Sequence, residues 1–223
     1  MNHQRTLHID LHTHTNHSPD SLISPRRLVE ACRERGIDCV AVTDHNSIQG
    51  ALAVRELADF PVIIGEEIRS AAGEIIALFL NEEVPRGLSA EETISRVKDQ
   101  GGLVGVPHPY DRLRSALRHE EMERLAERLD FIEALNARIV LPDNNGQARR
   151  FARDHGLAIS AGSDAHSPGE LGRTYVEMRE FDGPPDFLEA LRAGSLIGTL
   201  SSPLVHLWTR YAVLRRKLGW RPV

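Results

Sequence analysis

The chain has 223 residues, of which 41% are hydrophobic and 26% charged, as in ordinary globular proteins. Its length suits a single domain, and its formal net charge of -5 excludes a generally basic surface for nonspecific binding to nucleic acid. No apolar run approaches the roughly 20 residues that span a bilayer, and the N-terminus has no secretory signal. We therefore expect a cytoplasmic protein in which Cys32 and Cys39 are reduced thiols.

Short strand-like segments alternate with amphipathic helices along the chain. Alternating apolar residues predict a strand over 7–11, and a helix follows over 24–36, with Ser24 as its N-cap, Pro25 in its first turn and Gly36 at its end. Further strands are predicted over 38–43, 61–65, 75–80, 102–106, 130–135 and 157–162, and further helices over 47–58, 89–102, 120–129 and 145–156.

This order of elements predicts an α/β fold with parallel strands, either a barrel or a doubly wound sheet. Histidines and acids recur directly after the predicted strands. In a closed barrel the loops after the strands converge on one mouth, whereas in an open sheet they spread along an edge. The sequence therefore favours a barrel. The FDGPP stretch near 181–185 is expected to introduce a short helix rather than a second domain.

His12 and His14 lie two residues apart at the end of the first predicted strand. Side chains at this spacing share one face of a strand, so both imidazoles can bind the same cation. Alone the pair is weak, because a single His-x-His is more often incidental. Further candidate ligands follow this strand and later ones, and they are Asp20, Asp44, His45, Glu66, Glu67, His108, Asp164 and His166.

Each of these residues has a simple structural explanation when it is considered alone. Asp20 could belong to a turn, Asp44 could cap the helix that begins near Ser47, and one of Glu66 and Glu67 could be a solvated loop acid. Their recurrence at so many strand ends instead indicates a shared metal site. Imidazole and carboxylate ligands together suit Zn²⁺, Mn²⁺ or Fe²⁺, and the lack of cysteine ligands argues against a structural zinc site.

The ordered motifs DLHTH, TDH, GEEI, GVPHP and GSDAH resemble those of the PHP (polymerase and histidinol phosphatase) family. As a set in this order they are highly specific, and they are distributed over most of the chain. The resemblance implies a single distorted (β/α)7 barrel over 1–223. It also implies hydrolysis of phosphoesters by two to three divalent metal ions (Mn, Fe or Zn) at the mouth formed by the C-terminal ends of the strands.

The family pattern, carried over residue by residue, implies three metal sites. Glu67 is preferred to Glu66 because the pattern is an acid followed by a β-branched residue, here Ile68. The first site would use His12, His14, Glu67 and Asp164, the second would share Glu67 as a bridge and add Glu74 and His108, and the third would use Asp20, His45 and His166.

Four other assignments concern residues at the edge of these sites. Many family members have a histidine where this chain has Glu74, and a solvated strand residue is the alternative for that position. Glu133 is expected to position ligands rather than to bind metal. His17 and Asp44 are candidates for orienting ligands or donating protons.

A mechanism follows as a hypothesis. Two metals bridged by Glu67 would hold a water and lower its pKa toward neutrality, and the resulting hydroxide would attack phosphorus in line with the leaving oxygen. An arginine can hold phosphate bidentately, although any single arginine is more often a surface residue. The candidates are Arg138 and Arg173, followed by Arg112, Arg114 and Arg118.

The leading functional hypothesis is hydrolysis of phosphomonoesters, nucleotides or oligonucleotide ends, so the expected partner is a small phosphorylated substrate or a short nucleic-acid end. A histidinol-phosphatase-like activity is a narrower alternative. An amidohydrolase-type barrel also uses His-x-His and a late aspartate, but it usually needs a bridging lysine or a mid-chain histidine pair, and no predicted strand here ends in a suitable lysine. A noncatalytic metal-binding module would lack ligands, whereas this set is nearly complete.

The segment 203–223 predicts a C-terminal amphipathic helix with a basic character unlike the rest of the chain. We expect its apolar stripe to pack on the barrel or on a neighbouring subunit. Binding to a membrane surface or to nucleic acid is the alternative. The stripe consists of Leu204, Leu207, Trp208, Tyr211, Leu214 and Leu218, and the basic residues are Arg210, Arg215, Arg216 and Lys217.

Overall fold

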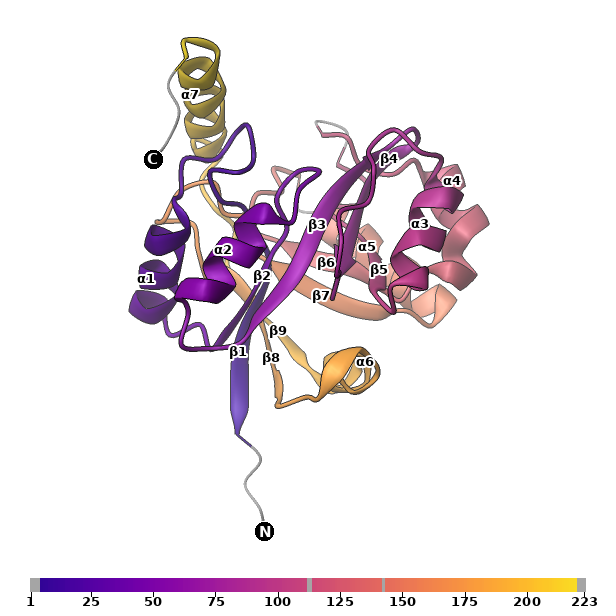
Figure 1. Ribbon diagram of the computed structural model, residues 1–223. Helices are drawn as coiled ribbons and strands as arrows, with labels where there is room; N and C mark the ends of the chain where they lie inside the picture. Colours follow the sequence, from indigo (N-terminus) through magenta and orange to yellow (C-terminus); the bar gives the residue numbers. More distant parts are fainter. Residues whose placement is uncertain (1–4, 112–113, 142, 220–223) are drawn as a thin grey trace.

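The computed structural model describes residues 5–111, 114–141 and 143–219 (Figure 1). Every strand and helix predicted from the sequence is present. The strands are β1 (Thr6–Thr13), β2 (Cys39–Val42), β3 (Val62–Ser70), β4 (Gly73–Leu78), β5 (Leu103–Val106), β6 (Phe131–Asn136), β7 (Ala158–Gly162), β8 (Thr174–Arg179) and β9 (Ser195–Gly198). The helices are α1 (Pro25–Arg35), α2 (Gln49–Leu57), α3 (Ala90–Asp99), α4 (His119–Leu125) with a 3-10 turn at Ala126–Arg128, α5 (Asp143–His155), α6 (Gly183–Ala193) and α7 (Val205–Lys217).

The helix boundaries follow from local chemistry. The Ser24 side chain accepts a hydrogen bond from the Arg27 amide at the start of α1, and the Ser89 side chain caps α3 in the same way. Gly36 ends α1 at a φ of 67°, a left-handed conformation that glycine adopts without the steric cost of a Cβ atom.

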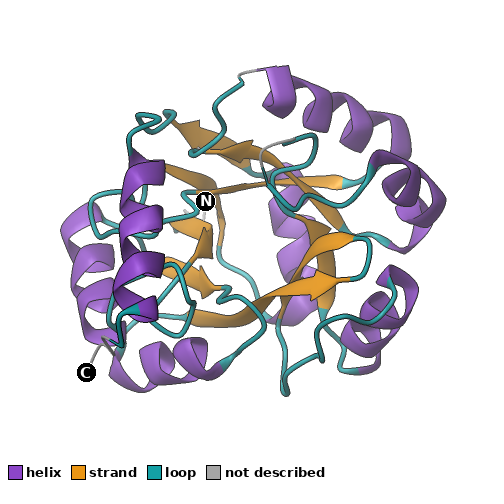
Figure 2. Cartoon of the chain, turned by 90° about the horizontal axis from the view of Figure 1, so that it is seen from above, coloured by secondary structure: helices purple, strands orange, loops and turns teal. Residues whose placement is uncertain are grey.

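Strands β1 to β7 form a nearly closed barrel. The sheet order is β7-β6-β5-β4-β3-β2-β1-β8-β9, and β1, β2 and β3 run parallel, as do β5, β6 and β7. The His14 amide donates to the Ala165 carbonyl at 3.1 Å and the Asp164 amide to the His12 carbonyl at 2.7 Å, which joins the end of β1 to the end of β7. Figure 2 shows the strands as a ring with helices around it. The predicted distorted (β/α)7 barrel is therefore confirmed.

Two features differ from a regular alternation of parallel strands and helices. Strand β4 pairs antiparallel with both neighbours, because only two residues join it to β3 and a parallel crossover needs a connection of a dozen or more. Strands β8 and β9, which the sequence pattern did not predict, extend the sheet antiparallel from the edge of β1. Their pairing covers the edge of β1 that would otherwise be open.

The two faces of the strands pack differently. One face packs against α1 to α5, and the other forms a second apolar cluster in which Ile9 and Leu11 of β1 lie with Phe131 of β6 and Phe187 of α6. Both cysteines are buried and free, as expected. The core thus fixes the positions of the strand ends that carry the polar side chains.

The apolar stripe of α7 does not pack on the barrel, contrary to one of the two expectations from the sequence. The exposed fractions of the six stripe side chains lie between 42% for Trp208 and 78% for Leu218. The only buried residue of α7 is Ala212, and in Figure 1 the helix projects beyond the rest of the molecule. Its polar side faces the barrel instead, through Thr209 and Arg216.

Among the described residues, no helix combines the length and the apolar character needed to cross a membrane.

The contact between Gly105 of β5 and Phe131 of β6 provides a test of this packing. A Cβ atom at Gly105 would overlap the Phe131 ring, which is 1% exposed. We expect Gly105→Ala to lower the free energy of unfolding by about 1–3 kcal/mol in urea denaturation. Gly169→Ala is the matched control, because a Cβ atom at Gly169 would meet nothing within 4 Å. An equal effect of the two substitutions would contradict the packing.

Candidate metal centre

All nine predicted ligands meet at the C-terminal mouth of the barrel. His12 belongs to the end of β1, Glu67 to β3 and Glu74 to β4, and the other six lie in loops that leave the strands. The ligands are His12, His14, Asp20, His45, Glu67, Glu74, His108, Asp164 and His166, and seven of them are less than 9% exposed. Asp20 and His45 are partly exposed and lie at the entrance.

Glu67 occupies the centre of the cluster. Its Oε1 lies 3.0 Å from His108 Nε2, and its Oε2 lies 3.4 Å from the Nε2 atoms of both His12 and His14. Oε2 is also 3.2 Å from His45 Nδ1. One carboxylate therefore faces four imidazoles, which is the arrangement that a bridging ligand requires.

The first predicted site has its donor atoms close together. His12 Nε2 and His14 Nε2 are 3.1 Å apart, and Asp164 Oδ1 lies 3.4 Å from the His14 nitrogen and 3.8 Å from the His12 nitrogen. A cation about 2 Å from each ligand atom needs ligands roughly 3–4 Å apart. The geometry and the nitrogen and oxygen donors thus fit Zn²⁺, Mn²⁺ or Fe²⁺.

His45, predicted only for the third site, lies between the second and third predicted sites. His108 Nε2 lies 3.8 Å from Glu74 Oε2, and Glu74 groups with His45 and Glu67 as potential ligands of one ion. Asp20 Oδ2 lies 3.4 Å from His45 Nε2.

His166 is the remaining residue of the third predicted site, and it also lies close to Asp20. Asp20 Oδ2 lies 3.1 Å from His166 Nε2, and His166 also groups with His14 and His45. With one ring nitrogen toward Glu67 and the other toward Asp20, His45 can serve either of two neighbouring ions.

Glu66 and Glu67 have opposite surroundings although they are adjacent. Because successive residues of a strand point to opposite faces, Glu66 faces away from the cluster. Its Oε2 accepts a hydrogen bond from the Val84 amide at 2.9 Å, and burial raises its pKa to about 7. The geometry therefore supports Glu67 as the ligand.

Glu133 holds two of the candidate ligands, His12 and His108, in place. Its Oε1 accepts a hydrogen bond from His12 Nδ1 at 3.0 Å, and its Oε2 accepts one from the His108 amide at 2.6 Å. Asn136 connects it to the cluster by donating to Glu133 at 2.9 Å and to Asp164 at 3.0 Å. Such partners fix the ring orientation of metal-binding histidines.

Asp44 acts on His14 through Ser18, a residue that the sequence analysis did not single out. The Ser18 hydroxyl donates to Asp44 Oδ1 at 2.8 Å and lies 3.2 Å from His14 Nδ1. Asp44 also accepts from the Thr15 amide and hydroxyl. Gly50 of α2 packs directly against Asp44, because a Cβ atom at this position would overlap the Asp44 carboxylate.

Asp10 was also missed, although it opens the DLHTH motif. Its Oδ1 accepts from the Ser163 amide at 2.9 Å and its Oδ2 from the Gly172 amide at 3.0 Å, and burial raises its pKa to about 6. It joins β1 to the segment after β7. An acid between the apolar residues of the predicted strand was the only sequence signal.

The charges of the cluster favour ionised bridging ligands. Burial opposes ionisation of Glu67, but His45 and His12 hold its pKa well below the usual range. Burial likewise opposes ionisation of Asp164, whose pKa Arg114 and His12 lower strongly. Burial and the charge of Glu67 raise the pKa of Glu74.

Several of the candidate ligands line a pocket, and Arg114 lies in its wall. It pairs with Asp164 through Nη1, and its Nε lies 3.4 Å from Asp111 Oδ2. Its Nη2 is buried and has no hydrogen-bond partner among the residues that the structure describes. The pocket, with a volume of about 230 Å³, also has Arg138, His206 and Thr209 in its wall.

Arg138 reaches the pocket but is engaged by protein groups. It is 3% exposed, donates to the Asp164 carbonyl at 3.3 Å and to the Val205 carbonyl at 3.4 Å, and hydrogen-bonds Thr209. Its Nε lies 3.5 Å from Glu170 Oε2. These contacts attach α7 to the barrel.

The remaining predicted residues lie outside this pocket. Arg173 and His17 are exposed and do not belong to its wall, and Arg118 lines a neighbouring cavity. Arg112 lies outside the described residues.

Comparison with known proteins relates this centre to a family. Residues 10–84 match the PHP domain, and residues 142–196 match the PHP-associated family. Two uncharacterized proteins of Methanocaldococcus jannaschii are similar to the chain. MJ1587 is 43% identical over 57% of the chain and 81% of its own length, and MJ0417 is 32% identical over 91% of the chain and 87% of its own length.

A solved structure has the same fold. It is a two-domain protein from Bacteroides vulgatus described as containing a predicted PHP-like metal-dependent phosphoesterase, and it superimposes with a TM-score of 0.74 at 22% identity. The match covers 89% of this chain and 66% of the Bacteroides protein. From the two matched segments it follows that the chain belongs to the PHP domain family.

Proposed function

We propose that the protein hydrolyses phosphoesters with two or three divalent metal ions held by the nine clustered ligands. The observation that carries the proposal is the position of Glu67, whose two oxygens face His12, His14, His45 and His108. Bound divalent cations at such a centre supply Lewis acidity toward phosphoryl oxygens and make water nucleophilic at neutral pH.

The protein's own residues have separate roles in this proposal. Glu67 would bridge two metal ions, Glu133 fixes the ring of His12 and the backbone of His108, and Asp44 fixes His14 through Ser18. This rigid arrangement keeps the donor atoms in place without reorganisation during the reaction.

Arg114 is the arginine best placed to hold the phosphate. Its buried Nη2 lacks a partner among the described residues, and a guanidinium can bind two phosphate oxygens at once. Arg138 is occupied by Thr209 and by backbone carbonyls, which favours a role in fixing the wall. The surface position of Arg173 favours no contact with substrate.

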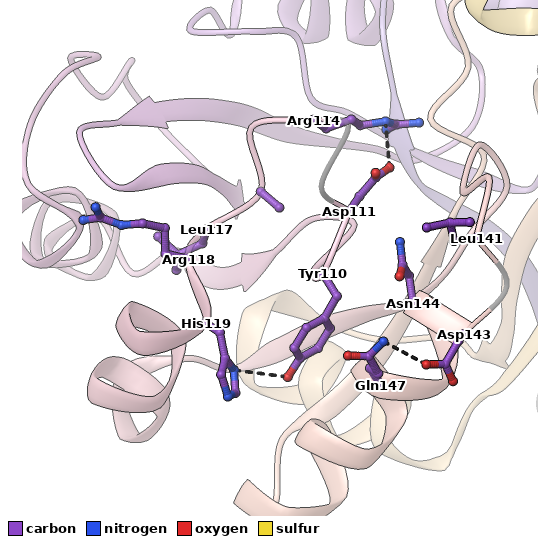
Figure 3. A pocket seen from close by; sticks show the side chains of 11 residues that line it. Tyr110, Asp111, Arg114, Leu117, Arg118, His119, Leu141, Asp143, Asn144 and Gln147 are labelled. Atoms are coloured by element: carbon purple, nitrogen blue, oxygen red, sulfur yellow. Dashed lines mark hydrogen bonds and ion pairs between the residues drawn. The ribbon is translucent and has the colours of Figure 1, made fainter.

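A second cavity next to the metal pocket offers space for a leaving group larger than a simple alcohol (Figure 3). It has a volume of about 740 Å³, and Arg114 borders both this cavity and the metal pocket. Tyr110 lies on one side and the amides of Asn144 and Gln147 on the other (Figure 3), with Arg118 also in the wall. Aromatic, amide and cationic groups together favour nucleotides or oligonucleotide ends as substrates.

An amidohydrolase-type reaction is the second candidate, because the two chemistries share the His-x-His motif. That site usually carries a bridging lysine. The chain has only two lysines, Lys98 and Lys217, and they lie on α3 and α7. Glu67 stands at the bridging position instead, which favours the phosphoesterase.

Elemental analysis followed by a panel of esters tests the proposed function. We expect the purified protein to contain Mn, Fe or Zn and to hydrolyse phosphomonoesters, nucleotides or short oligonucleotides with added Mn²⁺. The panel includes histidinol phosphate and an amide substrate. Bound metal with turnover of the amide alone would overturn the proposal.

The adjacent acids of β3 allow a matched pair of variants. We expect Glu67→Gln to abolish turnover and to remove at least one equivalent of bound metal, because a neutral amide is a poor bridge. Glu66→Gln keeps an acceptor for the Val84 amide and lies outside the cluster, so it should retain both properties. Metal content by mass spectrometry and initial rates provide the measurements, and the opposite pattern would assign the bridge to Glu66.

Glu133→Gln tests the positioning role. An amide oxygen can still accept one hydrogen bond, but it attracts the His12 ring more weakly than a carboxylate does. We expect metal affinity to fall by about 10–100-fold, measured by competition with a chromophoric chelator, while the urea midpoint changes little. An unchanged affinity would mean that the other contacts of His12 suffice.

A further inference from the structure

The exposed apolar side chains of the protein are concentrated on α7. Nine large hydrophobic residues are exposed in the described chain, and six of them form the stripe of α7. An exposed apolar patch of contiguous residues usually marks an interaction site. Trp208 and Tyr211 lie at its centre, with ring centroids 5.4 Å apart.

The helix is held with its polar side against the protein. Arg216 donates to the Ser18 carbonyl at 3.0 Å, Thr209 binds Arg138, and His206 Nε2 lies 3.2 Å from the Arg138 carbonyl. Turning the stripe toward the barrel would break these contacts and expose buried Ala212. The apolar face is therefore directed outward by specific interactions.

The charge of the segment identifies the kind of surface it fits. No acidic residue follows Glu189 in the sequence, whereas 203–223 contains five basic residues in a chain with a net charge of -5. Arg210 and Lys217 are exposed beside the stripe, and the Arg215 guanidinium lies 5.7 Å from the centre of the Tyr211 ring. The partner must therefore be apolar and anionic at once.

We propose that α7 docks the protein onto an anionic phospholipid surface. Leucines with tryptophan and tyrosine on one face and arginine or lysine beside them are typical of helices that lie in the membrane interface. The convex, projecting position of α7 in Figure 1 suits a flat, deformable surface. Since His206 and Thr209 on the opposite face line the metal pocket, the membrane would lie beside its mouth.

A second copy of the chain is a less suitable partner. Stripe-to-stripe packing would bring Arg210, Arg215 and Lys217 of two helices together, and 203–223 has no acid to neutralise them. Nucleic acid would satisfy the basic residues but would leave the leucines exposed to water.

Tryptophan fluorescence of the whole protein tests the proposal. Both tryptophans of the chain, Trp208 and Trp220, lie in this segment, so Trp220→Phe leaves Trp208 as the single reporter. We expect vesicles of phosphatidylglycerol, but not of phosphatidylcholine, to shift its emission to shorter wavelength. Sedimentation should recover the protein with the same vesicles.

Two sets of variants separate the apolar and the electrostatic contributions. Replacing Arg210, Arg215 and Lys217 by glutamine should weaken partitioning about fivefold for each residue, the equivalent of about 1 kcal/mol per basic residue near the membrane. Leu207→Gln with Leu214→Gln should also weaken it. Leu57→Gln is the matched control, because Leu57 is an exposed leucine on α2.

Three results would overturn the proposal. One is unchanged emission with anionic vesicles. Another is an emission shift of Trp208 that occurs without vesicles and increases with protein concentration. If the molecular mass also doubled, a second copy of the chain would be the partner. The third is vesicle binding that the leucine substitutions do not weaken. Because no arm measures hydrolysis, failure here leaves the phosphoesterase proposal standing.

Discussion

The arrangement of the barrel mouth depends on the burial of the Glu67 carboxylate among imidazoles. A buried carboxylate is strongly unfavourable unless charges or hydrogen bonds compensate it. Glu67 is 1% exposed, and its neighbours His12 and His14 have Nε2 atoms only 3.1 Å apart. Divalent cations would satisfy the nitrogens and the carboxylate simultaneously. The cluster is therefore well suited to hold metal ions.

The nearly closed barrel allows residues from distant parts of the chain to share this centre. The hydrogen bond from the Asp164 amide to the His12 carbonyl ties β1 to the segment after β7. Asp164 and His108 both have positive φ angles, of 53° and 30°. Residues other than glycine rarely adopt this conformation, and it persists where surrounding contacts determine the backbone. Glu133 and Asn136 supply such contacts to both residues.

The sequence predicted which candidate ligands cluster, together with the positioning residues Glu133 and Asp44, but not Ser18 or Asn136. Ligands such as His45 and Asp164 follow strands, and the order of parallel strands places all such positions at one mouth. Ser18 and Asn136 act through contacts across the fold, which residue type and spacing do not reveal. Strands β8 and β9 were not predicted: β8 lies between β1 and β9 and depends on both pairings, and β9, at the edge of the sheet, has no buried residue. The role proposed for Arg114 depends on its buried Nη2 atom and on the cavity that it borders, neither of which the sequence reveals.

Helix α7 illustrates a different limit of sequence patterns. Periodicity identifies an apolar stripe, but it does not say whether that stripe faces the protein. On α7 polar contacts of Arg138 and Arg216 determine which way the apolar stripe faces. They outweigh the hydrophobic effect that favours burial of Leu207 and Leu214. A helix held in this inverted way leaves apolar surface in water, which is unfavourable unless something covers it. Burial of the stripe in a lipid surface would remove that cost without disturbing the contacts that join α7 to the metal pocket.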